Sequence, residues 1–297
     1  MRILLFLLTN AAVLLLISIL FQVLGIGDYL HQNGVPLSLD SLLLSSAVIG
    51  MSGSFISLLM SKWMAKKSMG VHMIEHPANQ TEQWLVDTIS RQARRLNIGM
   101  PEVGIFDTPD PNAFATGMSK NSSLVAVSTG LLHRMNPDEV EAVLGHEMSH
   151  VANGDMVTMG LLQGVVNTFV YFFATVAGYL VDRVLLRSGD DDRAGFGPAY
   201  YITQMVAQIL LSILATMIVM WFSRWREFRA DAGGAQLAGR TKMVEALRAL
   251  QRAHDPQDLP GEMAAFGISG GGASGFQKLF LSHPPLEERI AALHNQR

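Results

Sequence analysis

Long apolar stretches constrain the fold of this chain more than any other feature. Residues 3–24 and 41–61 are uncharged runs, each long enough to cross a membrane, which takes about 20 helical residues. Residues 156–181 and 200–223 form two further apolar runs. The first run lacks a small-residue cleavage site, so we interpret it as a retained anchor rather than a secretory signal. The sequence therefore predicts a polytopic membrane protein with four hydrophobic helices.

The overall composition agrees with a membrane location. Of the 297 residues, 49% are hydrophobic and 16% are charged, whereas soluble domains average about 25% charged residues. The net charge is -3 and no basic stripe is present, which argues against nucleic-acid binding. The chain has no cysteine, so disulfides and thiolate ligands are excluded. Any transition-metal site must therefore use histidine, aspartate or glutamate.

Positive residues near the ends of the apolar runs predict the orientation in the membrane. Those that follow the second and fourth runs are Lys62, Lys66, Lys67, Arg224, Arg226 and Arg229. Cytoplasmic segments carry an excess of lysine and arginine, which places the N-terminus and the two segments after these runs in the cytoplasm. We expect two membrane helices and an outer loop in 1–61, a first catalytic part in 62–155, a membrane hairpin in 156–223 and a second catalytic part in 224–297.

The third and fourth apolar runs are more polar than the first two. They contain Gln163, Asn167, Gln204 and Gln208. Polar residues at membrane depth need protein or water neighbours. Two interpretations of these runs therefore remain. Either both cross the membrane fully, or both form helices that pack partly against the catalytic domain.

The segments outside the membrane combine helix and strand patterns. Residues 81–97 repeat apolar side chains with the helical period, and residues 101–107 and 122–128 are short apolar or β-branched runs. A turn-rich stretch separates the two runs. We therefore predict an α+β fold, mainly α, in which a sheet precedes the next helix.

That next helix has clear signals at both ends in the stretch NPDEVEAVLGHEMSHVANGD. Asn136 suits the N-cap, Pro137 suits the first helical position, and Glu139 completes a capping box. The Asn153-Gly154 pair supplies a C-terminal stop. The HEMSH motif is therefore predicted to lie inside a helix.

Within this helix the motif has the spacing of a zinc-peptidase centre. His146 and His150 are four residues apart, so their imidazoles lie on one face and can bind one tetrahedral zinc ion. Glu147 can reach a zinc-bound water without binding the metal, which is the HExxH arrangement. This pattern arises by accident in roughly one chain in a hundred of this length. A third protein ligand is therefore needed to support the assignment.

The stretch REFRADAGGA offers Glu227 and Asp231, four residues apart on one predicted helix. One carboxylate can complete the zinc site while the other orients a histidine ligand. The alternative is that both are solvated acids among arginines beside the membrane.

Three motifs in this order, HEMSH, EFRAD and SHPPLEERI, together with the four apolar segments, resemble the HtpX-type membrane zinc metalloproteases. The resemblance covers nearly the whole chain. It implies a zincin-like, gluzincin-type domain in the cytoplasm that binds one Zn²⁺ per chain through His146, His150 and Glu227. It also implies that Glu147 is the general base and that Asp231 hydrogen-bonds a ligand histidine.

The resemblance adds meaning to two further stretches. PNAFATG matches the family's edge strand, which implies that Asn112, Ala113 and Phe114 bind an extended substrate. In SHPPLEERI, it implies that His283 and Arg289 lie near the substrate carbonyl, where a donor stabilises the oxyanion. From the residues alone, Asn112 is a turn residue and His283 a loop residue before a helix.

The resemblance further implies a multi-pass protein of the bacterial inner membrane that degrades misfolded or damaged membrane proteins and unfolded polypeptides under stress. It implies the lipid bilayer and an ATP-dependent membrane protease as partners. An intramembrane protease is one alternative, although the acidic residues of the motif helix argue against a lipid environment. A non-catalytic scaffold with a structural zinc is another, although such sites usually have four protein ligands. The glycine-rich residues 266–276 are either a flexible linker or a mobile cover on the cleft.

Overall fold

The structure, a computed structural model, describes residues 38–185, 196–254, 279 and 281–295, together with Ile19 and Val23. Two compact units form, one from residues 1–56 and 158–219 and the other from residues 57–157 and 220–297. Apart from Ile19 and Val23, the predicted membrane run 3–24 lies outside the described residues, and so does the glycine-rich stretch 266–276. A mainly helical α+β fold is confirmed.

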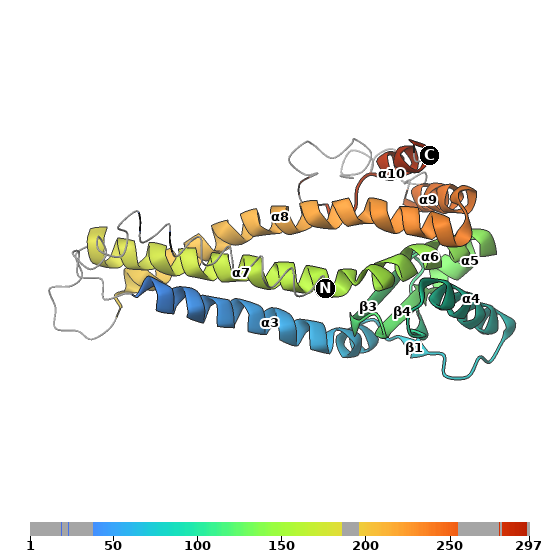
Figure 1. Cartoon of the computed structure of the whole chain (residues 1–297), viewed down its shortest axis with the longest axis horizontal. Helices are drawn as coiled ribbons and strands as arrows, with labels where there is room; N and C mark the ends of the chain where they lie inside the picture. Colours follow the sequence, from blue (N-terminus) through green and yellow to red (C-terminus); the bar gives the residue numbers. More distant parts are fainter. Residues whose placement is uncertain are drawn as a thin grey trace, which may run out of the picture. The chain divides into compact units, whose positions relative to one another are not determined.

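Among the described residues, three helices are long and apolar enough to span a membrane. They are α3 (Leu39–Ser68), α7 (Asp155–Tyr179), which continues into a π-helical turn η1 (Leu180–Leu185), and α8 (Pro198–Ala238). These helices contain the second, third and fourth predicted runs, and their apolar parts run side by side in the first unit (Figure 1). Three of the four predicted hydrophobic helices are therefore present in the part of the chain that the structure describes.

Small and polar residues allow these helices to pack closely. A Cβ atom on Gly50 would lie 2.5 Å from the backbone nitrogen of Thr168, so only glycine fits at that crossing. The Ser54 hydroxyl donates to the Gly160 carbonyl. Gln204 Nε2 donates to Thr175 Oγ1 at 3.0 Å. Polar side chains of the third and fourth runs thus find partners within the helical unit, as apolar surroundings require.

The second unit contains a four-stranded sheet in the order β1-β2-β4-β3. Its strands are β1 (His72–Met73), β2 (Glu102–Phe106), β3 (Ala113–Ser119) and β4 (Ser122–Ser128). Strands β2 and β4 are parallel, whereas β1 and β3 pair antiparallel with their neighbours. The two strands predicted from apolar runs are confirmed. The turn-rich stretch between them also contains a strand, β3, which lies at the edge of the sheet.

Among the described residues, five helices lie wholly within this unit, which also contains the end of α3, the start of α7 and the end of α8. They are α4 (Gln80–Leu96), α5 (Thr129–Arg134), α6 (Pro137–Asn153), α9 (Arg240–His254) and α10 (Leu286–Asn295). Helix α6 packs against α4, β3 and α9, and its Leu144 and Met148 are fully buried in the shared core. The core therefore holds α6 from several directions.

The ends of α6 match the sequence prediction. The Asn136 side chain accepts from the Glu139 amide at 3.0 Å, and the Glu139 carboxylate accepts from the Asn136 amide at 2.9 Å. This capping box contributes about 1 kcal/mol. At the other end, Gly154 adopts φ +67°, a left-handed conformation that favours glycine. The HEMSH residues are thus held in a short helix with two defined ends.

Candidate metal centre

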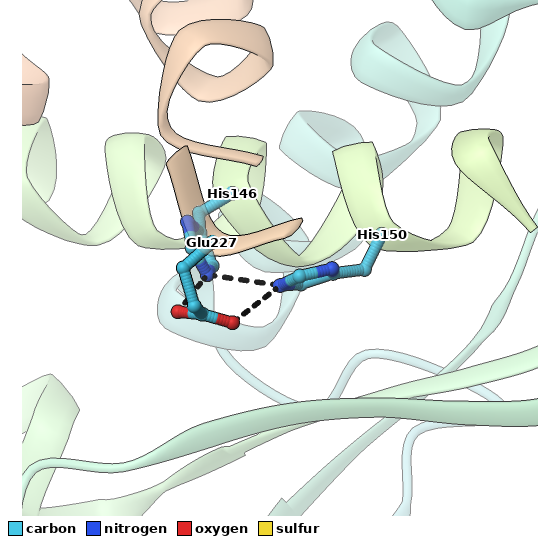
Figure 2. A group of neighbouring side chains, drawn as sticks. All are labelled: His146, His150 and Glu227. Atoms are coloured by element: carbon cyan, nitrogen blue, oxygen red, sulfur yellow. Dashed lines mark hydrogen bonds and ion pairs between the residues drawn. The ribbon is translucent and has the colours of Figure 1, made fainter. Parts of the chain in front are cut away.

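Three side chains from two helices converge on one point (Figure 2). His146 Nε2 and His150 Nε2 of α6 lie 3.1 Å apart. The carboxylate of Glu227 in α8 places Oε2 3.5 Å from His146 Nε2 and Oε1 3.3 Å from His150 Nε2. Ligand atoms around a tetrahedral zinc ion, with bonds of about 2.0–2.2 Å, are separated by about 3.3–3.5 Å. The three groups therefore have the spacing of a zinc site.

The protonation pattern of the histidines also fits a cation. His146 Nδ1 lies 2.9 Å from Asp231 Oδ1, and His150 Nδ1 lies 2.7 Å from Asp155 Oδ2. A carboxylate only accepts hydrogen bonds, so each Nδ1 carries a proton, and each Nε2 presents a lone pair when its imidazole is neutral. Two lone pairs and the Glu227 carboxylate then face each other in a buried place, where they repel unless a cation lies between them. Two imidazoles and one carboxylate are a ligand set that suits Zn²⁺.

Arg289 of α10 fixes the carboxylate that orients His146. Its Nη2 lies 2.6 Å from Asp231 Oδ1 and its Nε lies 2.8 Å from Asp231 Oδ2, a two-bond contact. Burial alone would raise the pKa of Asp231, but Arg289 and His146 outweigh it and hold this pKa below its usual range. Asp231 is therefore ionised and accepts the His146 proton.

Glu227 also has an environment that favours its ionised form. Burial would raise the pKa of its carboxyl, but the imidazoles of His146, His150 and His283 hold this pKa well below its usual range. His283 Nδ1 lies 2.6 Å from Glu227 Oε2, and Arg289 Nη1 lies 3.4 Å from the same oxygen. Glu227 is therefore an anion surrounded by potential donors.

The sequence did not reveal two residues that support His150. Asp155, the first residue of α7, accepts the His150 Nδ1 proton, and Arg226 Nη2 lies 2.7 Å from Asp155 Oδ2. Burial lowers the pKa of Arg226 to about 10, so its guanidinium remains charged at neutral pH. The general need of a ligand histidine for a carboxylate partner is the signal that points to Asp155. On one continuous helix, residues five positions apart do not share a face, so the sequence did not indicate this contact. The break at Gly154 allows it, because α6 ends there and Asp155 begins α7.

A pocket of about 810 Å³ opens beside the three converging groups. The predicted site residues on its wall are His146, Glu147, Asn112, Ala113, His283 and Arg289. Phe114 is not on the wall; its ring packs against Phe106 with centroids 5.4 Å apart. The structure thus brings the candidate base, one candidate ligand, His146, and the start of the edge strand to one cavity.

Comparisons with known proteins agree with this geometry. The model of peptidase family M48 matches residues 79–297. The chain is 63% identical over 292 residues to Protease HtpX of Thioalkalivibrio sulfidiphilus and 61% identical over 292 residues to Protease HtpX of Pseudoalteromonas atlantica, covering 98% of each chain in both cases. The crystal structure of S. mikatae Ste24p matches with a TM-score of 0.61 at 19% identity, over 94% of this chain. The chain spans 66% of that solved chain's length, and the likeness concerns the fold alone.

Proposed function

This chain belongs to peptidase family M48 as an HtpX-type membrane metalloprotease, and on that premise we propose that it is a zinc endopeptidase in which His146, His150 and Glu227 hold the metal. The observation that carries this proposal is the approach of three ligand atoms whose histidines are each bound to a carboxylate at the other ring nitrogen. We assign one zinc ion to each chain.

Zinc held there would supply Lewis acidity, which lowers the pKa of a bound water to about 7 and polarises a carbonyl group. Glu147 lies on the pocket wall next to His146. Its carboxylate takes the proton of the attacking water as the new C–O bond forms, and it delivers that proton to the nitrogen as the peptide C–N bond breaks. The products are a carboxylic acid and an amine, the acid's remaining proton passes to the amine to give a carboxylate and an ammonium group, and Glu147 returns to its starting state.

The edge strand β3 is the proposed docking site for the substrate backbone. The Ser128 amide donates to the Asn112 carbonyl at 2.8 Å, so the backbone of Asn112 faces β4. Backbone groups alternate along a strand, which turns the N–H and C=O of Ala113 towards the free edge. An extended peptide can pair there beside the pocket. Phe114, packed on Phe106, contributes by holding this edge in place.

His283 and Arg289 are the proposed donors near the scissile carbonyl. His283 lies on the pocket wall, its side chain is 62% exposed, and its Nδ1 contacts Glu227. In its imidazolium form, with both ring nitrogens protonated, it can donate from Nε2 to a developing oxyanion. Arg289 adds a buried positive charge on the same wall while it positions Asp231.

We further propose that the site acts at the cytoplasmic face of the bacterial inner membrane. The lysines and arginines after the second and fourth apolar runs support this orientation. The substrates are loosened loops of misfolded membrane proteins and unfolded polypeptides, with an ATP-dependent membrane protease as a partner that extracts them. A structural zinc site in a scaffold is less well supported, because the described residues offer three groups at this point rather than four. An intramembrane protease is also less well supported, because the metal groups lie in the unit that contains the sheet.

The Glu147→Gln variant tests this function. We expect it to retain zinc and to lose about 10²–10⁴-fold in cleavage rate, because the amide cannot accept the proton of the attacking water. Metal analysis and the cleavage of casein and of a loosened membrane protein give the two readouts. His146→Ala should lose both zinc and activity.

The matched control is Glu141→Gln on the same helix. Glu141 lies away from the metal groups, and its carboxylate is 2.7 Å from the Lys242 ammonium group. It should cleave as the unchanged protein does. A Glu147→Gln protein that cleaves at the unchanged rate would exclude Glu147 as the base.

A further inference from the structure

A short connector carries His283 and leads into α10. The structure describes it at residue 279 and over residues 281–285. Arg224 of α8 contacts the main chain of this connector through one guanidinium nitrogen. Its Nη1 donates to the Leu281 carbonyl at 2.8 Å and to the Leu279 carbonyl at 3.1 Å. Two carbonyl groups of the connector therefore converge on a single charged donor.

The side chains of the connector before His283 do little to hold it in place. Leu279 and Leu281 are each 39% exposed, and the His283 side chain is 62% exposed. Segments with few buried side chains are the least stable parts of a folded unit. Among the described residues, the hydrogen bonds to Leu279 and Leu281 come from Arg224. The order of this part of the connector therefore depends on Arg224.

Helix α8 also contacts the connector at His283 itself. Glu227 Oε2 lies 2.6 Å from His283 Nδ1. Arg224 and Glu227 are three residues apart on α8, and residues at this spacing are neighbours on a helix surface. Two points about one turn apart on α8 thus fasten the connector, one by its main chain and one by the imidazole. Because Glu227 is one of the metal groups, these two contacts set where His283 lies relative to the candidate metal centre.

We propose that Arg224 is a positioning residue for the cleavage reaction, which acts through the connector to hold the His283 imidazole beside the metal groups. This inference deepens the proposed function and rests on it. A donor that is already in place before the reaction stabilises developing charge without a cost of ordering. Without Arg224, the connector loses two hydrogen bonds, and His283 must be ordered in each turnover. The loss therefore falls on kcat.

Zinc binding should be spared, because Arg224 makes none of the contacts that join the three metal groups to each other or to their carboxylate partners. This separates Arg224 from Asp155 and Asp231, which hydrogen-bond the histidines directly. A change in kcat at unchanged zinc affinity is thus the expected signature of the connector.

Arg224→Met tests the proposal in the full-length, zinc-loaded protein in detergent. Methionine keeps a long, unbranched side chain but has no donor. We expect kcat for a quenched fluorescent peptide to fall by about 10-fold, the effect of losing hydrogen bonds from a charged donor. Arg224→Lys should recover most of kcat, because both bonds come from one nitrogen and an ammonium group offers three donors. Competition with a chelator should give the same zinc affinity for all three proteins.

The matched control is Arg229→Met on the same helix. Arg229 is exposed, and its guanidinium lies over the Trp225 ring, 5.1 Å from the centroid. This variant removes the same charge near the same end of the apolar run, so it reports any general effect of charge on membrane insertion. It should cleave as the unchanged protein does.

The His283→Ala background separates positioning from a general effect on stability. If Arg224 acts through His283, Arg224→Met causes no further loss of kcat in a protein that lacks the imidazole. A merely structural role would give the same fold-loss in both backgrounds. If Arg224→Met does not accumulate in the membrane, the same pair of measurements with Arg224→Gln decides.

Three results would overturn the inference: an unchanged kcat in Arg224→Met, the same fold-loss with and without His283, or an equal loss in Arg229→Met. Hydrolysis that Glu147→Gln abolishes but that Arg224→Met leaves unchanged rejects this inference alone. Absence of hydrolysis by the zinc-loaded, unchanged protein rejects the proposed function itself.

Discussion

The two halves of helix α8 differ in which side chains they expose and which they bury. Its first half exposes large apolar residues, among them Leu210 at 58% and Leu214 at 56%. Its second half buries charged residues, with Arg226 5% exposed, Glu227 3% and Asp231 1%. One continuous helix therefore serves two surroundings. Burial follows the solvent and the partners available at each position rather than the residue type.

The physical reason differs between the halves. Lipid chains are as apolar as leucine, so an apolar face turned to a bilayer loses nothing by being exposed. A buried charge is tolerated only when it is paired and hydrogen-bonded. Each buried charge in the second half is paired, because Arg226 contacts Asp155, Glu227 contacts three histidines, and Asp231 contacts Arg289 and His146. The pairing of Arg226 is incomplete, since its Nε and Nη1 are buried without a hydrogen-bond partner among the described residues.

The largest expected effect comes from Glu227→Gln in the charged half. The amide keeps the shape but removes the anion between the histidines. Removing one partner from a buried charged set costs about 3–5 kcal/mol, so zinc affinity should fall on the order of 10³-fold and cleavage should be lost. Competition with a chelator of known affinity measures this change. Glu245→Gln, at an exposed ion pair of α9, is the control. Unchanged zinc affinity in Glu227→Gln would exclude Glu227 as a ligand.

In the apolar half of α8, adding a charge should be unfavourable, whereas in the charged half removing one is. We expect Leu214→Arg to oppose membrane insertion of this helix by about 2.5–3.5 kcal/mol, the cost of an arginine at the centre of a membrane helix. A glycosylation-based insertion assay measures the inserted fraction. Leu214→Phe, which stays apolar, should insert as the unchanged helix does. If Leu214→Arg inserts equally well, this face does not meet lipid.

A smaller effect is expected from Asp155→Asn, which removes the charge that orients His150 and pairs with Arg226. Loss of such a partner typically weakens metal binding by about 10–100-fold. The affinity should fall by that amount, while excess zinc restores most of the cleavage rate. Asp87→Asn on α4, at an exposed aspartate bound to Gln83, serves as the control. Equal zinc affinity in both variants would show that Asp155 does not support the site.

The smallest effect is expected for an exposed charge of the same unit. Arg248 pairs with Glu245 on α9 at 2.7 Å, and both side chains are nearly half exposed. Surface pairs of this kind contribute about 0.5 kcal/mol or less. Arg248→Ala should therefore hardly change the thermal midpoint in detergent or the zinc affinity. A loss as large as that of Asp155→Asn would erase the distinction between buried and exposed charges.

Local patterns predicted much of the fold. The caps around α6, the apolar runs of α3, α7 and α8, and strands β2 and β4 depend on neighbouring residues, whose preferences are visible in the sequence. Strand β3 was not visible from its own residues, because its stretch is rich in turn formers. It becomes a strand by pairing with β4, with Ala113 opposite Val127.

The sequence by itself determined the membrane character and the pair His146 and His150, because apolar length and a spacing of four residues act within single helices. Only the tertiary structure decided which groups meet that pair. Asp155 and Arg226 complete the support of His150, and the pocket beside Glu147 is lined by residues of α5, α6, α9 and α10. Such contacts depend on how separate elements pack, and no short-range pattern in the chain encodes that packing.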